Sequence, residues 1–120
     1  MKKLILSEKN SFVLYTSPSG DIKLEVFLQD ETLWLTQKLI AELFETTKQN
    51  ISLHLDNIIK EQELTKESVV KEFLTTASDG KKYRTQYYNL DAIIAVGYRV
   101  NSRRATQFRI WATQVLKEYI

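Results

Sequence analysis

Residues 48–60, with the sequence KQNISLHLDNIIK, carry side chains whose types and spacing suit contact with nucleic acid. Glutamine and asparagine each combine a donor with an acceptor, so either can bond adenine bidentately in the major groove of DNA. Serine hydroxyl and lysine ammonium groups suit phosphate oxygens. The residues that we expect to read or position bases are Gln49, Asn50, Ser52 and Asn57, and the lysines that we expect to hold phosphates are Lys48 and Lys60.

Two residues of the same segment count slightly against DNA binding. Asp56 would repel a phosphate, and Leu53 would be an exposed apolar side chain. Leu53 could nevertheless meet a thymine methyl group, as a DNA-binding residue, or a partner subunit. The alternative interpretation is a helical hairpin whose amides are only solvated, since helix pairs of this length are common in ordinary cores.

Apolar spacing places residues 48–60 on the second of two helices. The apolar positions recur at intervals of three and four residues: Leu39, Ile40, Leu43 and Phe44, then Ile51, Leu55, Ile58 and Ile59. Thr36 can cap the first helix, and Thr46 or Thr47 the second, by accepting a bond from a free backbone N–H. The connection that remains is very short, which predicts a helix-turn-helix.

A β-hairpin is predicted after the helix pair, where a winged-helix protein has its wing. Residues 68–76 and 82–89 are the predicted strands, and the Asp79-Gly80 pair between them is a strong hairpin signal. Three cations of the tip and the return strand would hold phosphates: Lys81, Lys82 and Arg84. The alternative is a solvated hairpin tip without a binding role.

The remaining elements complete an α+β domain. They are a hairpin over residues 12–28, a short strand at 33–35, and two helices over 91–100 and 103–120. We predict a single winged-helix-like domain over residues 1–120, a helix-turn-helix flanked by two β-hairpins and closed by two carboxy-terminal helices. The last helix is still apolar at Ile120, so the domain is expected to be the amino-terminal part of a longer protein.

Three arginines crowd the first half of the closing helix, namely Arg103, Arg104 and Arg109. Two of them fall in the first turn, where positive charge opposes the helix dipole. They either take part in binding or pair with acidic residues of the fold, and the sequence supports both interpretations equally. The acidic candidates are Asp91 and Glu42.

Composition argues against several classes of site. The 120 residues include no cysteine and one histidine, His54, which excludes disulfides and thiolate metal sites. No glycine-rich phosphate loop and no nucleophile elbow is present, so we expect no enzyme activity, no catalytic residue, no cofactor and no small-molecule ligand. The net charge of +2 allows only local basic surfaces. Without a signal peptide or a membrane-spanning run, a soluble cytoplasmic protein is predicted.

The chain resembles the RhuM family of bacterial virulence-associated proteins, from VFLQDETLWLTQKLIAELFETTKQNISLHL to YYNLDAIIAVGYRVNSRRATQFRIWATQVLKEYI. The segment NSRRATQFRIWATQVL is the most specific part. The layout is more distantly similar to the amino-terminal domain of Bro-type phage antirepressors, whose closing helix has an F-x-x-W core, here Phe108 and Trp111. These resemblances imply DNA binding, and RhuM members are usually longer than this chain.

The predicted function is double-stranded DNA binding in a regulatory, virulence or phage setting. One module of this size offers DNA a modest interface, so a two-fold homodimer is also expected. The residues expected to meet across the dimer are Val115, Leu116, Tyr119 and Ile120. Alternatively, they pack on the first hairpin of their own chain. The other functions that the sequence allows are a protein-interaction or oligomerisation module and the regulatory front end of a larger protein.

Overall fold

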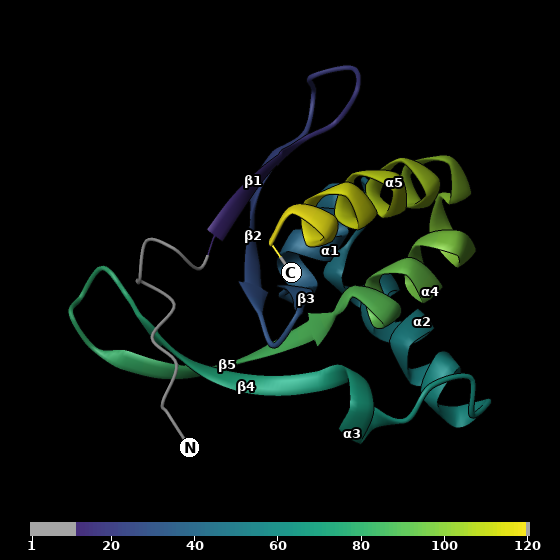
Figure 1. The fold of residues 1–120 in the computed structure, drawn as a ribbon. Helices are drawn as coiled ribbons and strands as arrows, with labels where there is room; N and C mark the ends of the chain where they lie inside the picture. The colour runs from purple at the N-terminus through teal and green to yellow at the C-terminus, as the bar shows by residue number, and fades with distance from the viewer. Residues whose placement is uncertain (1–11, 120) are drawn as a thin grey trace.

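Residues 12–119 are described by the structure, a computed structural model. Five strands form one antiparallel sheet in the order β1-β2-β3-β5-β4. The strands are β1 (Phe12–Thr16), β2 (Lys23–Gln29), β3 (Thr32–Leu35), β4 (Val70–Thr76) and β5 (Lys82–Asn89). The helices are α1 (Gln37–Leu43), α2 (Lys48–Lys60), α3 (Lys66–Val69), α4 (Leu90–Val100) and α5 (Ser102–Tyr119). Figure 1 shows the long helices gathered on one side, while the β4–β5 hairpin extends away from them.

Both predicted hairpins are present, and their strands join into a single sheet. β1 pairs with β2 and β4 pairs with β5, each in antiparallel register. The two hairpins meet where β3 pairs with β5, at Trp34↔Asn89 and Leu35↔Tyr88. The predicted mixing of helices and strands is thereby confirmed, whereas the winged-helix assignment stays a prediction.

One short helix replaces the expected start of the second hairpin. The strand predicted from Ser68 begins instead at Val70, because α3 occupies Lys66–Val69. Val69 is buried, and the turn of helix directs it into the main core. Burial of Val69 in the core accompanies this turn of helix, which the apolar spacing of residues 68–76 did not indicate.

The two predicted helices of the pair are α1 and α2, and a threonine caps each of them. Thr36 Oγ1 accepts a hydrogen bond from the backbone N–H of Leu39 at 3.3 Å. Thr47 Oγ1 accepts one from the backbone N–H of Asn50 at 3.1 Å. Each cap satisfies one of the donors that a helix amino terminus leaves unpaired.

The turn between α1 and α2 contains a residue in the left-handed conformation. Thr46 N donates to Ala41 O at 2.9 Å and Glu45 N donates to Glu42 O at 3.3 Å, which is the bonding of a Schellman turn. Glu45 holds the left-handed position, with φ 56°, where most such turns have glycine. An L side chain costs about 1–2 kcal/mol there, so other contacts must stabilise the turn.

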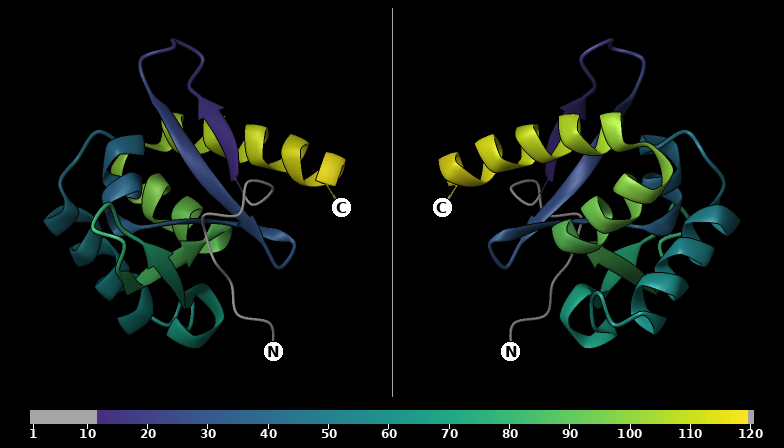
Figure 2. Two further views of the ribbon diagram at one scale, coloured as in Figure 1. Left: turned by 90° about the vertical axis from the view of Figure 1, so that its left-hand side faces the viewer. Right: turned by 90° about the vertical axis from the view of Figure 1, so that its right-hand side faces the viewer.

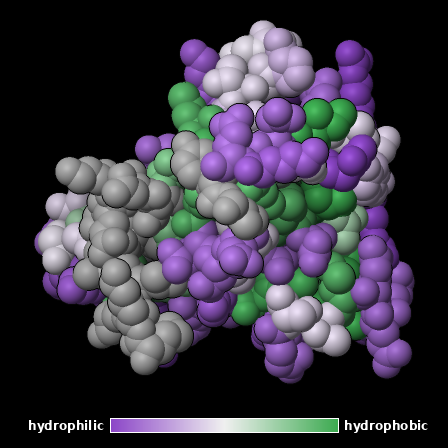
Figure 3. Space-filling model, in the orientation of Figure 1, coloured by the Kyte–Doolittle hydropathy of each residue, from purple (hydrophilic) through white to green (hydrophobic). Residues whose placement is uncertain are grey.

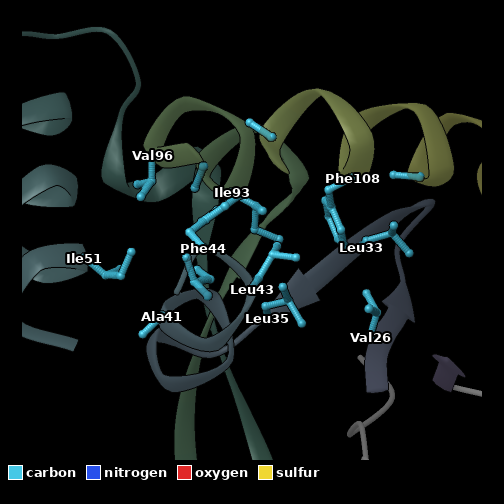
Figure 4. Close-up of a cluster of buried hydrophobic side chains, with 14 of the residues drawn as sticks. Val26, Leu33, Leu35, Ala41, Leu43, Phe44, Ile51, Ile93, Val96 and Phe108 are labelled. Carbon is cyan, nitrogen blue, oxygen red and sulfur yellow. The ribbon is translucent and has the colours of Figure 1, made fainter. Parts of the chain in front are cut away.

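The main core lies between the sheet and the helices. Figure 4 shows Leu33 of β3 beside Phe108 of α5, and Leu35 beside Leu43 of α1. Three of the four apolar residues that the spacing indicated on α2 are buried, namely Ile51, Leu55 and Ile58, and Ile59 is half-buried against the core. Burial of these apolar stripes is what fixes the helices against the sheet.

Gly97 marks a close approach between helices. A Cβ atom built there would lie 2.5 Å from Cζ of Phe44 and 2.7 Å from Cβ of Ala105. Carbon atoms in contact prefer about 3.5–4.0 Å, so α4 can approach the α1–α2 turn and α5 this closely only with glycine. Tight packing therefore explains a glycine that weakens its own helix.

A second, smaller cluster lies on the other face of the sheet, and its buried members are Phe27, Trp34, Phe73 and Tyr87. The Phe73 ring meets the Trp34 and Tyr87 rings edge to face, with 5.5 Å between centroids in each pair. Trp34 is thus a packing residue. Burial raises the pKa of Tyr87 to about 12, because a phenolate is poorly solvated there.

The closing helix α5 crosses the first hairpin, as both views of Figure 2 show. The Tyr15 ring lies 5.0 Å from the Phe108 ring and 4.9 Å from the Trp111 ring. Val115 is buried and Leu116 is half-buried against the chain's own core. Packing within the chain thus accounts for two of the four residues expected at a dimer contact. The other two, the Tyr119 side chain and Ile120, lie outside the described residues.

Candidate nucleic-acid interface

The outer face of α2 is accessible. Leu53 is the most exposed of its apolar residues, at 55%. Four of the predicted contact residues differ in exposure: Lys48, Gln49 and Lys60 are exposed, whereas Asn57 is half-buried. Asp56 is exposed among them, so the repulsive residue noted in the sequence does belong to this surface.

Two donors of Asn50 already form hydrogen bonds within the chain. Its Nδ2 donates to Oγ1 of Thr46 at 2.9 Å, and its backbone N–H donates to the Thr47 cap. Bidentate bonding to adenine needs both the amide donor and the amide oxygen, and the donor already holds the α1–α2 turn. Asn50 is therefore a weaker candidate for reading a base than Gln49.

A groove separates α2 from the β4–β5 hairpin. Its deeper part is a cavity of about 440 Å³ with an apolar floor that includes Leu55 and Val70. Polar and charged groups surround this floor: Gln37, Ser52, Asp56, Lys60, Lys66, Gln86 and Tyr88. Two predicted residues of α2, Ser52 and Lys60, thus face the hairpin across the groove.

The groove continues into a second cavity of about 400 Å³. The two cavities share Gln37, Gln86 and Tyr88, so they lie next to each other. Cations from three elements line the second cavity: Lys38 of α1, Lys48 of α2 and Arg84 of β5. The structure therefore brings two predicted phosphate-binding residues, Lys48 and Arg84, to one place.

Strand alternation extends this basic surface along the hairpin. Side chains two apart on a strand share a face, so Lys82 and Arg84 follow Gln86 and Tyr88 on the face of β5 that lines the groove. Lys81 lies apart from the groove walls, in the tip turn, where its N–H donates to Asp79 Oδ1 at 2.9 Å. The hairpin thus contributes two of its three predicted cations to the face directed at α2.

Acidic neighbours moderate the charge of the hairpin. Arg84 Nη1 lies 3.5 Å from Glu72 Oε1 across the β4–β5 pair, with the Arg84 side chain 79% exposed. At the tip, Tyr83 donates to Asp79 Oδ2 at 2.7 Å. This hydrogen bond and the one from Lys81 N–H hold the pKa of Asp79 below its usual value. The sequence missed Glu72 as a partner because cross-strand pairs depend on register.

The three arginines of α5 divide into structural and exposed groups. Arg104 is only 16% exposed, and its Nη2 pairs with Asp21 Oδ2 at 2.9 Å and with Glu45 Oε1 at 3.1 Å. Ion pairing within the fold is therefore the role of Arg104, but the predicted partners Asp91 and Glu42 were wrong. The actual partners lie in two turns, whose positions depend on the tertiary fold.

Arg104 stabilises the turn that orients α2. Glu45 is the left-handed residue of that turn, and Asp21 belongs to the β1–β2 connection. Hydrogen bonds from Ser19, Ser17 and then Arg104 hold the pKa of Asp21 far below its usual value. The remaining two arginines behave differently: Arg103 is exposed, and Arg109 Nε donates to the Tyr98 hydroxyl at 3.3 Å.

A second arginine, missed by sequence reasoning, holds the other end of α2. Arg99 Nη2 pairs with Glu61 Oε1 at 2.8 Å and with Glu63 Oε1 at 3.0 Å. These hydrogen bonds raise the pKa of Arg99. Ion pairs thus link the residues that flank both ends of α2 to α4 and α5.

The described part of the chain contains neither a cluster of metal-binding side chains nor a helix that could span a membrane. Residues 12–119 contain no group of three histidine, cysteine, aspartate or glutamate side chains that could hold a metal ion. His54, the one histidine, is half-buried on the flank of α2. Within the same residues, no helix is long and apolar enough to cross a bilayer.

Comparison with known proteins gives a family match for the carboxy-terminal part of the chain. Residues 68–120 match the model of the virulence protein RhuM family, which confirms the predicted RhuM resemblance there. The matched residues include the β4–β5 hairpin, α4 and α5, whereas α2 precedes them. No curated protein and no solved structure matches the chain significantly. The resemblance to Bro-type antirepressors stays a prediction.

Proposed function

We propose that this chain, whose residues 68–120 match the model of the virulence protein RhuM family, binds double-stranded DNA through α2 and the β4–β5 hairpin. One observation carries the proposal. Lys48 of α2 and Arg84 of β5, far apart in sequence, line the same cavity beside the exposed face of α2. Cations concentrated beside a free helix face are what a duplex with phosphates along both groove edges requires.

The dimensions of α2 suit a major groove. Its 13 residues span about 20 Å, and the major groove of B-DNA, roughly 12 Å wide, admits one helix. Gln49 and Leu53 would then face base edges, since both are exposed on the outer side of the helix. The hairpin would lie over the sugar–phosphate backbone, with Lys82 and Arg84 on the side nearest α2.

The low net charge bears on the expected affinity for duplex DNA. With a net charge of +2, attraction to DNA must come from this local surface. We therefore expect weak binding to any duplex, in the range of about 10⁻⁴–10⁻⁶ M at physiological salt. A preferred sequence would be bound more tightly through Gln49, Ser52 and Asn57.

Fluorescence anisotropy with a labelled duplex tests the proposal. Binding should weaken steeply as salt rises, and Lys48→Gln should weaken it further at every salt concentration. Lys117→Gln is the matched control, because Lys117 is an exposed lysine near the end of α5. The proposal fails if neither random nor genomic duplex binds at low salt. It also fails if the two variants behave alike.

The second candidate is a protein-interaction or oligomerisation module, including a two-fold dimer or the regulatory front end of a larger protein. Leu53, Leu14 and Ile110 are all large apolar side chains that are mostly exposed. Figure 3 also shows hydrophobic residues at the surface below α5. Light scattering at tens of micromolar separates the candidates: self-association lost in Leu53→Ser, with unchanged DNA affinity, would favour this role for the α2 face.

A further inference from the structure

We infer that the groove between α2 and the β4–β5 hairpin seats the backbone of one DNA strand at two phosphates. The first phosphate lies at one end of the groove, among Lys38, Lys48 and Arg84. The second lies at the other end, beside Lys60 and Lys66. This inference rests on the proposed DNA binding and adds to it the path of the strand and two lysines, Lys38 and Lys66, that the sequence did not indicate.

The first site is a cluster of three like charges, of which only Arg84 has an acidic partner among the described residues. Lys38 and Lys48 take no part in the ion pairs of the described residues. Arg84 has Glu72 at 3.5 Å, but its side chain is highly exposed, so a phosphate can compete for it. Cations from three elements around one cavity repel one another until an anion lies between them.

The cavity has room for that anion. Its volume is about 400 Å³, whereas a water molecule occupies about 30 Å³ in the liquid. A phosphate and its remaining waters therefore fit beside the three side chains. Arginine would supply two parallel donors and the lysines would act as point charges, a division of roles seen in other phosphate sites.

The second site follows from the length of α2. Lys48 and Lys60 stand at its two ends, separated by about 18 Å of helix rise. Asp56 lines the groove between them and would repel a phosphate placed there. The strand is therefore held at the ends of the groove, while its middle passes Asp56 without a phosphate contact.

The salt dependence of the binding constant reports how many phosphates the protein contacts. Each phosphate neutralised on B-DNA contributes about −0.9 to the slope of log K against log salt concentration. Because Lys38, Lys48 and Arg84 share one phosphate, changing all three to glutamine should make the salt slope less negative by about 0.9. Three separate phosphates would change it by three times that amount. The double variant Lys60→Gln with Lys66→Gln should reduce it by a further 0.9 or so, independently of the first set.

Two controls make the experiment decisive. Lys23→Gln and Lys117→Gln remove exposed lysines away from the groove and should leave the slope unchanged. Asp56→Asn should tighten binding roughly two- to fivefold at low salt, the scale of one exposed charge interaction. Circular dichroism should show that all variants keep the wild-type Tm, since every altered side chain except that of Arg84 lacks an ion pair within residues 12–119.

The possible outcomes distinguish failure of this inference from failure of the proposed DNA binding. If wild-type protein binds duplex but the triple variant keeps the wild-type slope, the strand does not lie in the groove and the inference is overturned. A slope that becomes less negative by about 2.7 in the triple variant would also overturn it, since each cation would then hold a separate phosphate. Absence of any wild-type binding would instead reject DNA binding itself, and stronger binding to a single strand than to its duplex would reject the duplex.

Discussion

Replacing Gly97 with alanine tests the packing that sets the position of α4. The added Cβ would lie 2.5 Å from Cζ of Phe44 and 2.7 Å from Cβ of Ala105. Both distances are about 1 Å shorter than ordinary carbon contacts. Phe44 and Ala105 are themselves buried, so relief requires movement of a packed ring and of a helix.

The net effect is a balance of two terms. Alanine stabilises the helix itself by about 1 kcal/mol relative to glycine. Overpacking a filled core costs about 1–3 kcal/mol, and two simultaneous clashes favour the upper part of that range. We expect the free energy of unfolding to fall by roughly 1–2 kcal/mol, which lowers Tm by about 4–8 °C in a domain of this size.

Urea denaturation of the wild type, Gly97→Ala, Phe44→Leu and the double variant measures the effect and its cause. Leucine is shorter than phenylalanine and removes the atom at 2.5 Å. The double variant should therefore lose less stability than the sum of the two single losses, by about 1 kcal/mol. An unchanged or raised stability of Gly97→Ala would refute the reasoning, because the helices would then have room for a methyl group.

Three further predictions concern the cap, an ionisable core residue and base recognition. Thr47→Ala removes the cap of α2 and should lower the free energy of unfolding by about 1 kcal/mol, measured by urea titration. Tyr87 should contribute stability that is fully present below its unfolded pKa of about 10 and is lost as pH rises towards 12, because burial raises the folded pKa to about 12. Tyr87→Phe should reduce the loss of stability between pH 8 and pH 11, measured by urea unfolding, and leave the part due to Tyr15, Tyr83 and Tyr88, whose pKa values are also raised. Gln49→Ala should change the preferred bases in selection from a random duplex pool, at about 1–3 kcal/mol per contact, whereas Asn50→Ala should mainly lower Tm because its amide donates to Thr46.

Local signals in the sequence were sufficient for most secondary structure. The caps at Thr36 and Thr47 and the Asp79-Gly80 turn depend on hydrogen bonds and dihedral preferences within a few residues. The ends of α1 and α2 were harder to predict. The left-handed residue that follows a helix is commonly glycine, which marks the end in the sequence, but here these residues are Glu45 and Gln62. The elements were therefore predictable and some of their boundaries were not.

Contacts between distant segments could not be predicted in the same way. The β3–β5 pairing that unites the hairpins has no local signature. The partners of Arg104 and the placement of Lys38 in the groove likewise depend on how the elements assemble. For the candidate site, residue types on α2 and the hairpin were sufficient to suggest phosphate contacts, but only the fold relates Lys48 to Arg84.

The ion pairs of Arg104 also bear on how this protein is made. The α1–α2 turn leaves the ribosome well before Arg104, which follows the end of α2 by 44 residues of chain. At about 5–20 residues per second, that interval lasts on the order of several seconds. During it, Glu45 and the first hairpin lack the guanidinium that joins them in the finished protein. These two ion pairs therefore form only after the start of α5 has been synthesised, and a nascent chain ending before Arg104 would present the α1–α2 turn without them.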